Sequence, residues 1–403
     1  MADILERLGE IDGYRDRAVE YLSRLIEIRA LSPENGGEGE WDKAEYIQSL
    51  LDFADSVERY DAEDERAKNG LRPNIVARIN GRSRRTLWVV SHMDVVPEGD
   101  LSLWESDPFT PRIEGDRVYG RGAEDNGQAI VSTILAGMFL AEHRPELTFG
   151  IVFVSDEETG SRYGIRHLLQ QGIFKEGDLF LVPDTGSPDG SLIEVAEKNI
   201  LWLKLEIHGK QGHASRPDMF FNASRRAMKI VLELDKMLHE RFNARNDLFE
   251  PPYSTFEPTK REKNVDNPNT IPGLDVSYLD CRVLPQYSNE EVIGLVRDFL
   301  RRKEEEDGYP CRLEVVQNES SPPTPENSEI VVRLKKALKV ARNIDAKLIG
   351  IGGNTCASFF RKAGFETAVW STLDGKAHEP NEYAKVSNII EDAKVFALLA
   401  HDL

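Results

Sequence analysis

The chain has little cysteine and no long apolar run. Three of its 403 residues are cysteine, and no two of them form a CxxC pair: Cys281, Cys311 and Cys356. An odd number of cysteines at wide spacing disfavours both a disulfide framework and a thiolate zinc site. The N-terminal residues carry charges throughout, and no apolar run approaches transmembrane length. We therefore expect no signal peptide and no membrane span, and we predict a cytoplasmic location.

Positive charge is also in short supply. The sequence has 51 lysine and arginine residues against 70 aspartate and glutamate residues, which gives a net charge of −19. This balance argues against nucleic acid and anionic membrane surfaces as partners. Internal repeats and long low-complexity segments are absent as well, and the remaining composition is that of an ordinary globular protein. Its length allows two or three domains.

Short apolar segments alternate with helical patterns over much of the chain. "TLWVVS", "LTFGIVFVSD" and "DLFLVPD" have the composition of buried strands, and "QAIVSTILAGMFLAEH" is a helix apolar on nearly all sides. Such alternation predicts an α/β fold, with a mixed, largely parallel sheet flanked by helices. We assign this catalytic domain to two parts of the chain, residues 1–198 and 321–403.

The pattern changes between these two parts. "ILWLKLEIHG" alternates apolar and polar residues, which is typical of a sheet with one wet face. The elements that follow give the order β-α-β-β-α-β, the order of a ferredoxin-like α+β domain. We therefore predict an inserted dimerisation or lid domain over residues 199–320.

Unusual polar residues come directly after several predicted strands. In an open α/β sheet, the carboxyl ends of the strands form the edge where functional residues gather. This edge is expected to receive two histidines and several carboxylates: His92, Asp94, Asp156, Glu157, Glu158, Asp184 and His378. Adjacent carboxylates repel one another, and a cation relieves that repulsion more directly than protonation does. Imidazole and carboxylate without thiolate suit zinc, cobalt or manganese.

Each motif alone also has a plain structural explanation. An HxD triplet is common, a DEE triplet often marks a solvated face, and "AHEPNEY" fits a simple turn. Their joint placement at strand ends is what favours a metal site. The glycine-rich "YGRGAEDNGQ" lacks the phosphate-loop lysine, and Glu124 and Asp125 would repel phosphate. We interpret it as a metal-ligand loop, with Asn126 or Gly127 opening the next helix.

The complete set of motifs resembles the M20 metallopeptidase family, which includes aminoacylase, carboxypeptidase G2, acetylornithine deacetylase and succinyl-diaminopimelate desuccinylase. "SHMDVVPEGD", "VYGRGAEDNGQ", "SDEETGS", "PDTG", "GKQGHASRP" and "AHEPNEY" occur in the family's order over nearly the whole chain. The resemblance implies two zinc ions per subunit, for which cobalt or manganese can substitute.

The resemblance also implies a role for each site residue. Asp125 would bridge the two ions, His92 and Asp184 would complete the first metal's shell, and Glu158 and His378 the second. Two catalytic residues accompany them: Glu157 as general base and Asp94 as the residue that holds His92. The peptide bond from Asp125 to Asn126 is expected to be cis.

Further implied residues lie in or near the inserted domain. His213 would reach the neighbouring subunit's active site and stabilise the oxyanion, which implies a homodimer formed through that domain. The substrate carboxylate would be bound by Asn269, Arg282, Gly352, Gly353 and Asn354. Arginine suits bidentate recognition of a carboxylate, although Arg282 fits an ordinary salt bridge equally well.

The expected function is hydrolysis of the amide bond of an N-acyl amino acid, as in succinyl-diaminopimelate desuccinylase or acetylornithine deacetylase. One alternative is a carboxypeptidase or dipeptidase acting on a short peptide. Another is a non-catalytic metal-binding assembly subunit, which should have lost Glu157 or a ligand, and none is lost. The chain departs from the family pattern after Asp125, where Asn126-Gly127-Gln128 replaces a hydrophobic residue and Lys-Gly. We expect this departure to affect substrate identity more than chemistry.

Overall fold

The computed structural model describes residues 2–401, which form two compact units. The larger unit contains the chain up to Val195, then Thr324–Leu348, then the chain from Thr355 onward. The smaller unit contains Ala196–Pro323 and the short segment Ile349–Asn354.

An eight-stranded mixed sheet forms the centre of the larger unit. Its four middle strands, β8, β5, β9 and β18, are parallel neighbours, whereas β1, β4 and β10 join antiparallel to their inner neighbours. In order across the sheet the strands are β1 (Ser56–Arg59), β4 (Ile75–Ile79), β8 (Thr148–Val154), β5 (Thr86–His92), β9 (Leu179–Ser187), β18 (Glu366–Thr372), β10 (Leu192–Glu197) and β17 (Lys347–Ile351). This architecture confirms the predicted α/β fold class.

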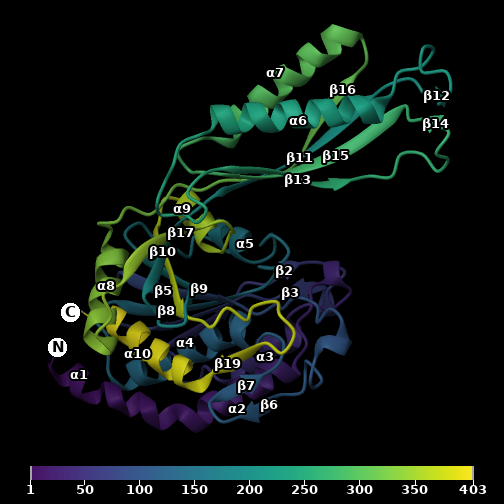
Figure 1. The fold of residues 1–403 in the computed structure, drawn as a ribbon. Coiled ribbons are helices and arrows are strands. Elements are labelled where there is room, and N and C mark those ends of the chain that lie inside the picture. Colours follow the sequence, from purple (N-terminus) through teal and green to yellow (C-terminus); the bar gives the residue numbers. More distant parts are fainter. Residues whose placement is uncertain (1, 402–403) are drawn as a thin grey trace. The chain divides into compact units, whose positions relative to one another are not determined.

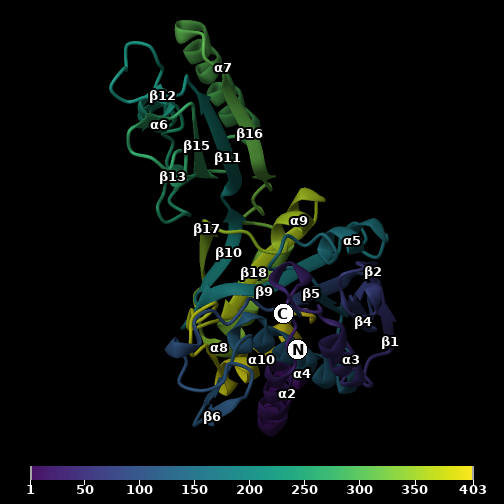
Figure 2. The same cartoon turned by 90° about the vertical axis from the view of Figure 1, so that its right-hand side faces the viewer.

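Helices cover both faces of this sheet (Figures 1 and 2). Leu87 and Val89 of β5 belong to one hydrophobic core, whereas Trp88 and Val90 belong to the core on the other face. The first core includes α2 (Arg15–Glu27), α3 (Trp41–Ser49), α4 (Ala129–Glu142), α8 (Glu329–Arg342) and α10 (Val386–Leu399), and the second includes α5 (Ile165–Gln170) and α9 (Ala357–Lys362). Burial on both faces explains why these strands are apolar at almost every position.

The smaller unit is an antiparallel sheet with two helices packed on one face (Figure 1). Leu201, Leu203 and Leu205 of β11 face these helices, and Trp202 between them is exposed. The sheet order is β13 (Thr255–Arg261), β15 (Leu274–Val283), β11 (Asn199–His208) and β16 (Cys311–Glu319), and the helices are α6 (Ala223–Arg241) and α7 (Asn289–Asp307). This is the ferredoxin-like topology that the element order predicts.

Several small elements complete the described chain. They are α1 (Ala2–Arg7), the 3-10 helices η1 (Leu8–Tyr14), η2 (Pro33–Asn35), η3 (Lys68–Gly70) and η4 (Leu101–Leu103), the π-helical turn η5 (Ala123–Gln128), and the strands β2 (Ala62–Glu63), β3 (Leu71–Arg72), β6 (Arg112–Glu114), β7 (Arg117–Tyr119), β12 (Gly212–His213), β14 (Thr270–Ile271) and β19 (Tyr383–Lys385). Across residues 2–401, none of the helices combines the length and apolar character that a membrane span requires.

The start of α4 differs from the prediction. We expected Asn126 or Gly127 to open this helix, but α4 begins at Ala129 and η5 precedes it. Asp125 and Asn126 have non-helical backbone angles, and the peptide bond between them is cis, as the family resemblance implied. The turn therefore presents Asp125 apart from the helix that follows.

Candidate metal centre

Five segments of the larger unit bring the predicted metal ligands together. His92 is the last residue of β5, Asp184 lies within β9, and Asp125 lies in η5. Glu158 follows the end of β8, and His378 stands in the loop between β18 and β19. The parallel strands thus deliver ligands at the same edge of the sheet, where α/β folds place their functional residues.

The carboxylate of Asp125 lies between the two histidines. Its Oδ1 is 2.9 Å from Nε2 of His92, and its Oδ2 is 3.0 Å from Nε2 of His378. Oδ1 of Asp184 is 3.5 Å from the same nitrogen of His92, and Oε1 of Glu158 is 3.2 Å from Nε2 of His378. Asp125 is therefore the one carboxylate that contacts both imidazoles.

Two overlapping groups of side chains have the spacing of a metal site. In His92, Glu157 and Asp184, and likewise in His92, Asp125 and Glu158, one potential ligand atom from each residue lies within 4.8 Å of the others. The donors are imidazole nitrogens and carboxylate oxygens, which suit zinc and related divalent ions. Spacing alone does not separate Glu157 from the ligands, so its role as a base needs a chemical test.

The electrostatics of the centre also fit a cation. Burial, together with the negative charge of Asp184, raises the pKa of Glu157 well above its usual value. Burial opposes the charged form of His92, but hydrogen bonds to Asp125, Asp184 and Asp94 outweigh it and raise the pKa of this imidazole well above 6.5. So many carboxylates around two imidazoles hold excess negative charge, which bound divalent ions would neutralise.

One thiol feels the charges of the site. Cys356 is buried, and burial, followed by the negative charge of Glu157, raises the pKa of its thiol well above the usual value. Cys356 belongs to neither of the two groups with metal-ligand spacing.

Asp94 holds two segments, and it does so differently from the prediction. The ring nitrogen Nδ1 of His92 lies 3.0 Å from the backbone carbonyl oxygen of Asp94, whereas the nearer carboxylate oxygen is 3.5 Å away. The carboxylate instead accepts hydrogen bonds from the backbone N–H groups of Glu157 and Glu158, each at 3.0 Å. Asp94 thus fixes the orientation of His92 and the position of the two glutamates together.

The first acid of the DEE triplet faces away from this cluster. Asp156 accepts a hydrogen bond from the backbone N–H of Tyr163 at 3.0 Å and another from the hydroxyl of Thr159. Its carboxylate also lies 3.8 Å from the guanidinium of the buried Arg72. The repulsion anticipated among three adjacent carboxylates therefore concerns only Glu157 and Glu158.

Three further residues support the site, and none of them was predicted to do so from the sequence. The carboxylates of Glu124 and Glu382 accept hydrogen bonds from backbone N–H groups beside His378 and Asp125, respectively. The side-chain amide of Asn126 donates to Oδ1 of Asp184 at 2.9 Å and to the carbonyl of Pro183 at 3.1 Å. All three lie inside the motifs quoted above. Hydrogen bonds to backbone groups require no particular residue type at a fixed spacing, so the sequence alone does not reveal them.

The predicted substrate-binding residues lie in the smaller unit. His213 in β12 pairs with Thr270 in β14, and the carbonyl of Asn269 accepts a hydrogen bond from the N–H of Ala214 at 2.7 Å. His213 is exposed, and its Nδ1 accepts from the N–H of Ser215. The structure thus brings His213 and Asn269 together in one small hairpin-like pairing.

Arg282 occupies a different part of the smaller unit. It forms a two-pronged ion pair with Asp280, at 2.6 and 2.9 Å, and its Nη1 donates to the carbonyl of Gly352 at 3.1 Å. Gly353 and Asn354 follow on the same short segment. A substrate carboxylate would therefore have to share this guanidinium with Asp280.

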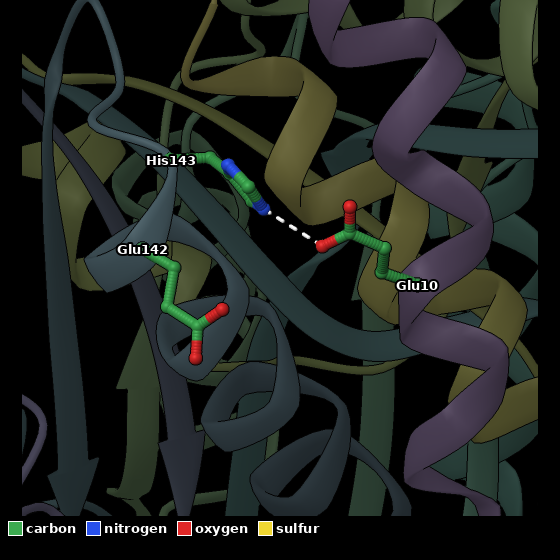
Figure 3. A group of neighbouring side chains, drawn as sticks. All are labelled: Glu10, Glu142 and His143. Carbon is green, nitrogen blue, oxygen red and sulfur yellow. Dashed lines mark hydrogen bonds and ion pairs between the residues drawn. The ribbon is translucent and has the colours of Figure 1, made fainter.

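A third acidic group lies on the surface of the larger unit. Figure 3 shows this group, which consists of Glu142 and His143 at the C-terminal end of α4 and Glu10 of η1. Nε2 of His143 lies 2.9 Å from a carboxylate oxygen of Glu10. Both glutamates are exposed. The ion pair accounts for this arrangement, and nothing else at the group indicates a bound ion.

Comparison with known proteins supports a metal-dependent hydrolase. Residues 88–402 match the family model of peptidase family M20/M25/M40. An uncharacterised metallohydrolase of Methanocaldococcus jannaschii is 41% identical over 401 residues, covering 94% of this chain and 98% of that protein. The succinyl-diaminopimelate desuccinylase of Wolinella succinogenes is 26% identical over 369 residues, covering 90% and 93%.

The fold has solved counterparts as well. An M20 family metallo-carboxypeptidase from Sulfolobus solfataricus superposes with a TM-score of 0.76 at 19% identity, covering 95% of this chain and 98% of that one. Together with the family match over most of the sequence, this agreement covers both the catalytic core and the insertion. The chain belongs to peptidase family M20/M25/M40 and is a metal-dependent hydrolase.

Proposed function

We propose that this hydrolase binds two zinc ions and cleaves the amide bond of an N-acyl amino acid. His92 and Asp184 would hold one ion, Glu158 and His378 the other, and Asp125 would contact both. The observation that carries this proposal is the carboxylate of Asp125, whose two oxygens lie 2.9 and 3.0 Å from the two imidazoles.

Bound ions would lower the pKa of a water molecule and polarise the scissile carbonyl. The protein's own contribution starts with Glu157, whose backbone N–H is fixed by Asp94. As general base, Glu157 would take a proton from the attacking water and return it to the leaving nitrogen.

The substrate class is supported by relatives and by chemistry. Desuccinylases match over nearly the whole chain, and their name describes removal of a succinyl group from an amino acid. Such a substrate carries a carboxylate beside the scissile amide, and the guanidinium of Arg282, which also pairs with Asp280 and donates to the carbonyl of Gly352, is a donor of the right type. Oxyanion stabilisation by His213 and the homodimer that it requires stay predictions.

The decisive variant is Glu157→Gln, which keeps the size of the side chain and removes its basicity. We expect kcat to fall by about 10²- to 10⁴-fold, the usual range for general-base catalysis, while zinc content stays at two ions per chain. Metal analysis by mass spectrometry and steady-state kinetics on the same sample would check this. Loss of an ion together with activity would identify Glu157 as a ligand and refute its assignment as base.

Substrate identity requires a panel on zinc-reloaded protein. We expect turnover of N-acyl amino acids such as N-succinyl-diaminopimelate or N-acetylornithine, and little turnover of dipeptides. The reverse preference would favour the carboxypeptidase or dipeptidase function, which the fold of the Sulfolobus enzyme also supports. Zinc binding without any hydrolysis would indicate a non-catalytic member of the family.

A further inference from the structure

His378 is the most exposed of the proposed metal ligands. Its side chain is 56% exposed, whereas those of His92, Glu158, Asp184 and Asp125 are between 2% and 15% exposed. It stands in the loop of residues 373–382, and its own backbone φ is 64°. Core packing therefore cannot fix its position, and other contacts must do so.

The buried carboxylate of Glu124 holds the chain that leads into His378. It accepts hydrogen bonds from the backbone N–H groups of Asp374 at 2.6 Å and Ala377 at 3.1 Å, and a further short one from that of Lys376. Only 3% of Glu124 is exposed. A carboxylate removed from water in this way needs such donors, so the loop and the side chain depend on each other.

A second buried carboxylate, that of Glu382, connects the His378 segment back to the turn that carries Asp125. Glu382 follows His378 by four residues and accepts from the backbone N–H groups of Gly122, Glu124 and Asp125 at 2.9–3.1 Å. The guanidinium of Arg121 also donates to Glu382 at 2.7 Å and to the carbonyl of His378 at 3.3 Å. The segment that carries Asp125 is thus held by the segment that carries His378.

We propose that Glu124 and Glu382 are positioning residues that form a reciprocal brace and set the separation of Asp125 from His378. Glu124 precedes Asp125 and holds the His378 loop, whereas Glu382 follows His378 and holds the Asp125 turn. The two carboxylates of the brace bind backbone N–H groups and not the metal-binding atoms of Asp125 or His378. The brace acts by restricting where the two ligands can stand, so its effect falls mainly on the affinity for the ion that His378 would hold, because both braced residues are ligands of that ion, whereas the other ion shares only Asp125 with the brace. This inference rests on the proposed two-metal site.

The brace is selective because the other half has separate supports. His92 is fixed by β5 and by the carbonyl of Asp94, and Asp184 by β9 and by the amide of Asn126. None of these contacts involves Glu124 or Glu382. Weakening the brace should therefore reduce the affinity for the ion at His378 far more than the affinity for the ion at His92, because Asp125 also contacts His92, and a general loss of stability would not be selective in this way.

The test compares Glu124→Gln with Glu379→Gln in the full-length chain. The first variant places an amide N–H₂ against backbone N–H donors. The second variant is the control, because Glu379 is on the same loop, is 53% exposed and pairs with Lys376. Competition titrations against a zinc chelator would give the two dissociation constants. We expect one of them to rise by about 10- to 100-fold in Glu124→Gln, the range typical of lost support around a ligand. Both should stay within twofold of wild type in Glu379→Gln.

A second variant, Glu382→Gln, approaches the brace from the other side and should weaken the same ion. The ion that keeps its affinity reports that each variant is folded, and circular dichroism gives an independent check. Unchanged affinities in both brace variants, or equal weakening of both ions, would overturn the inference. Wild-type protein that binds fewer than two ions would instead refute the two-metal proposal on which the inference rests, so the two failures are distinguishable.

Discussion

His92 and Asp184 are carried by neighbouring parallel strands, whereas Asp125 and His378 stand in a turn and a loop. In the strand-borne pair, here called the strand half, the side chains are 2% and 13% exposed, and β5 pairs with β8 as far as His92. The second pair, the loop half, has no such frame. Its geometry depends on carboxylates that are themselves buried and saturated with backbone donors.

The difference shows how a fold can place ligands without strands beneath them. A loop has many accessible conformations, and ordering it costs roughly 1–2 kcal/mol per residue in backbone entropy. Buried charged acceptors can offset that cost, because their bonds to N–H groups are stronger than neutral ones. We expect the strand half to be rigid in all states and the loop half to be the part that responds to metal.

The largest expected effect compares two histidine variants in metal-free protein. His92→Ala should lower the free energy of unfolding by about 3–5 kcal/mol, because it leaves buried carboxylates without their cationic partner. His378→Ala removes a largely exposed side chain and should cost no more than about 1 kcal/mol. Urea unfolding in the presence of a chelator measures both. An equal loss of unfolding free energy in the two variants would contradict the difference between the strand half and the loop half.

Metal removal should have the next largest effect, counted for each site. At free zinc a hundredfold above Kd, binding stabilises the folded state by about 2.7 kcal/mol per site. Chelation should therefore lower Tm, and hydrogen exchange should locate the change. We expect amides of the loop, such as those of Asp374 and Ala377, to exchange faster, while those of β5 stay protected. Faster exchange across β5 as well would contradict a rigid strand half.

The smallest expected effect concerns Asn126, the residue that follows Asp125. Asn126→Leu removes the amide that donates to Asp184. We expect about 10-fold weaker binding of one zinc ion, at the low end of the range for such supports. Combined with Glu124→Gln, it should weaken both ions, because the two residues support different halves. If the double variant binds only one of the two ions more weakly, Asn126 and Glu124 act on the same half.

The central strands were predictable from sequence because burial on both faces makes them continuously apolar. Two strands away from the centre, β1 and β10, were not. β1 is four residues long and only partly buried, and β10 contains Glu194 and Glu197, which look like surface residues. Glu194 is buried because Arg361 in α9 pairs with it at 2.9 Å. A partner 167 residues away cannot be inferred from local periodicity.

Some residues of the site could likewise be predicted from the sequence, and others could not. The residues that the motifs single out, from His92 to His378, are brought together in the larger unit, because strand ends are a reliable place to look. The supporting roles of Glu124 and Glu382 were not predicted, since a carboxylate that binds backbone N–H groups has no characteristic neighbours in sequence. The orientation of Asp156 was also beyond prediction, because the side-chain direction in a turn is set by tertiary contacts such as those to Tyr163 and Thr159.

The position of β18 bears on how the protein is made. This strand lies in the middle of the sheet, between β9 and β10, yet it is synthesised after Ala196–Pro323, the main part of the smaller unit. Until then β9 has an unpaired edge, which is a hazard for aggregation. His378 is synthesised a few residues later. The nascent chain therefore acquires its sheet and its last metal ligand almost together, and we expect premature termination before β18 to yield an insoluble product rather than a partly active one.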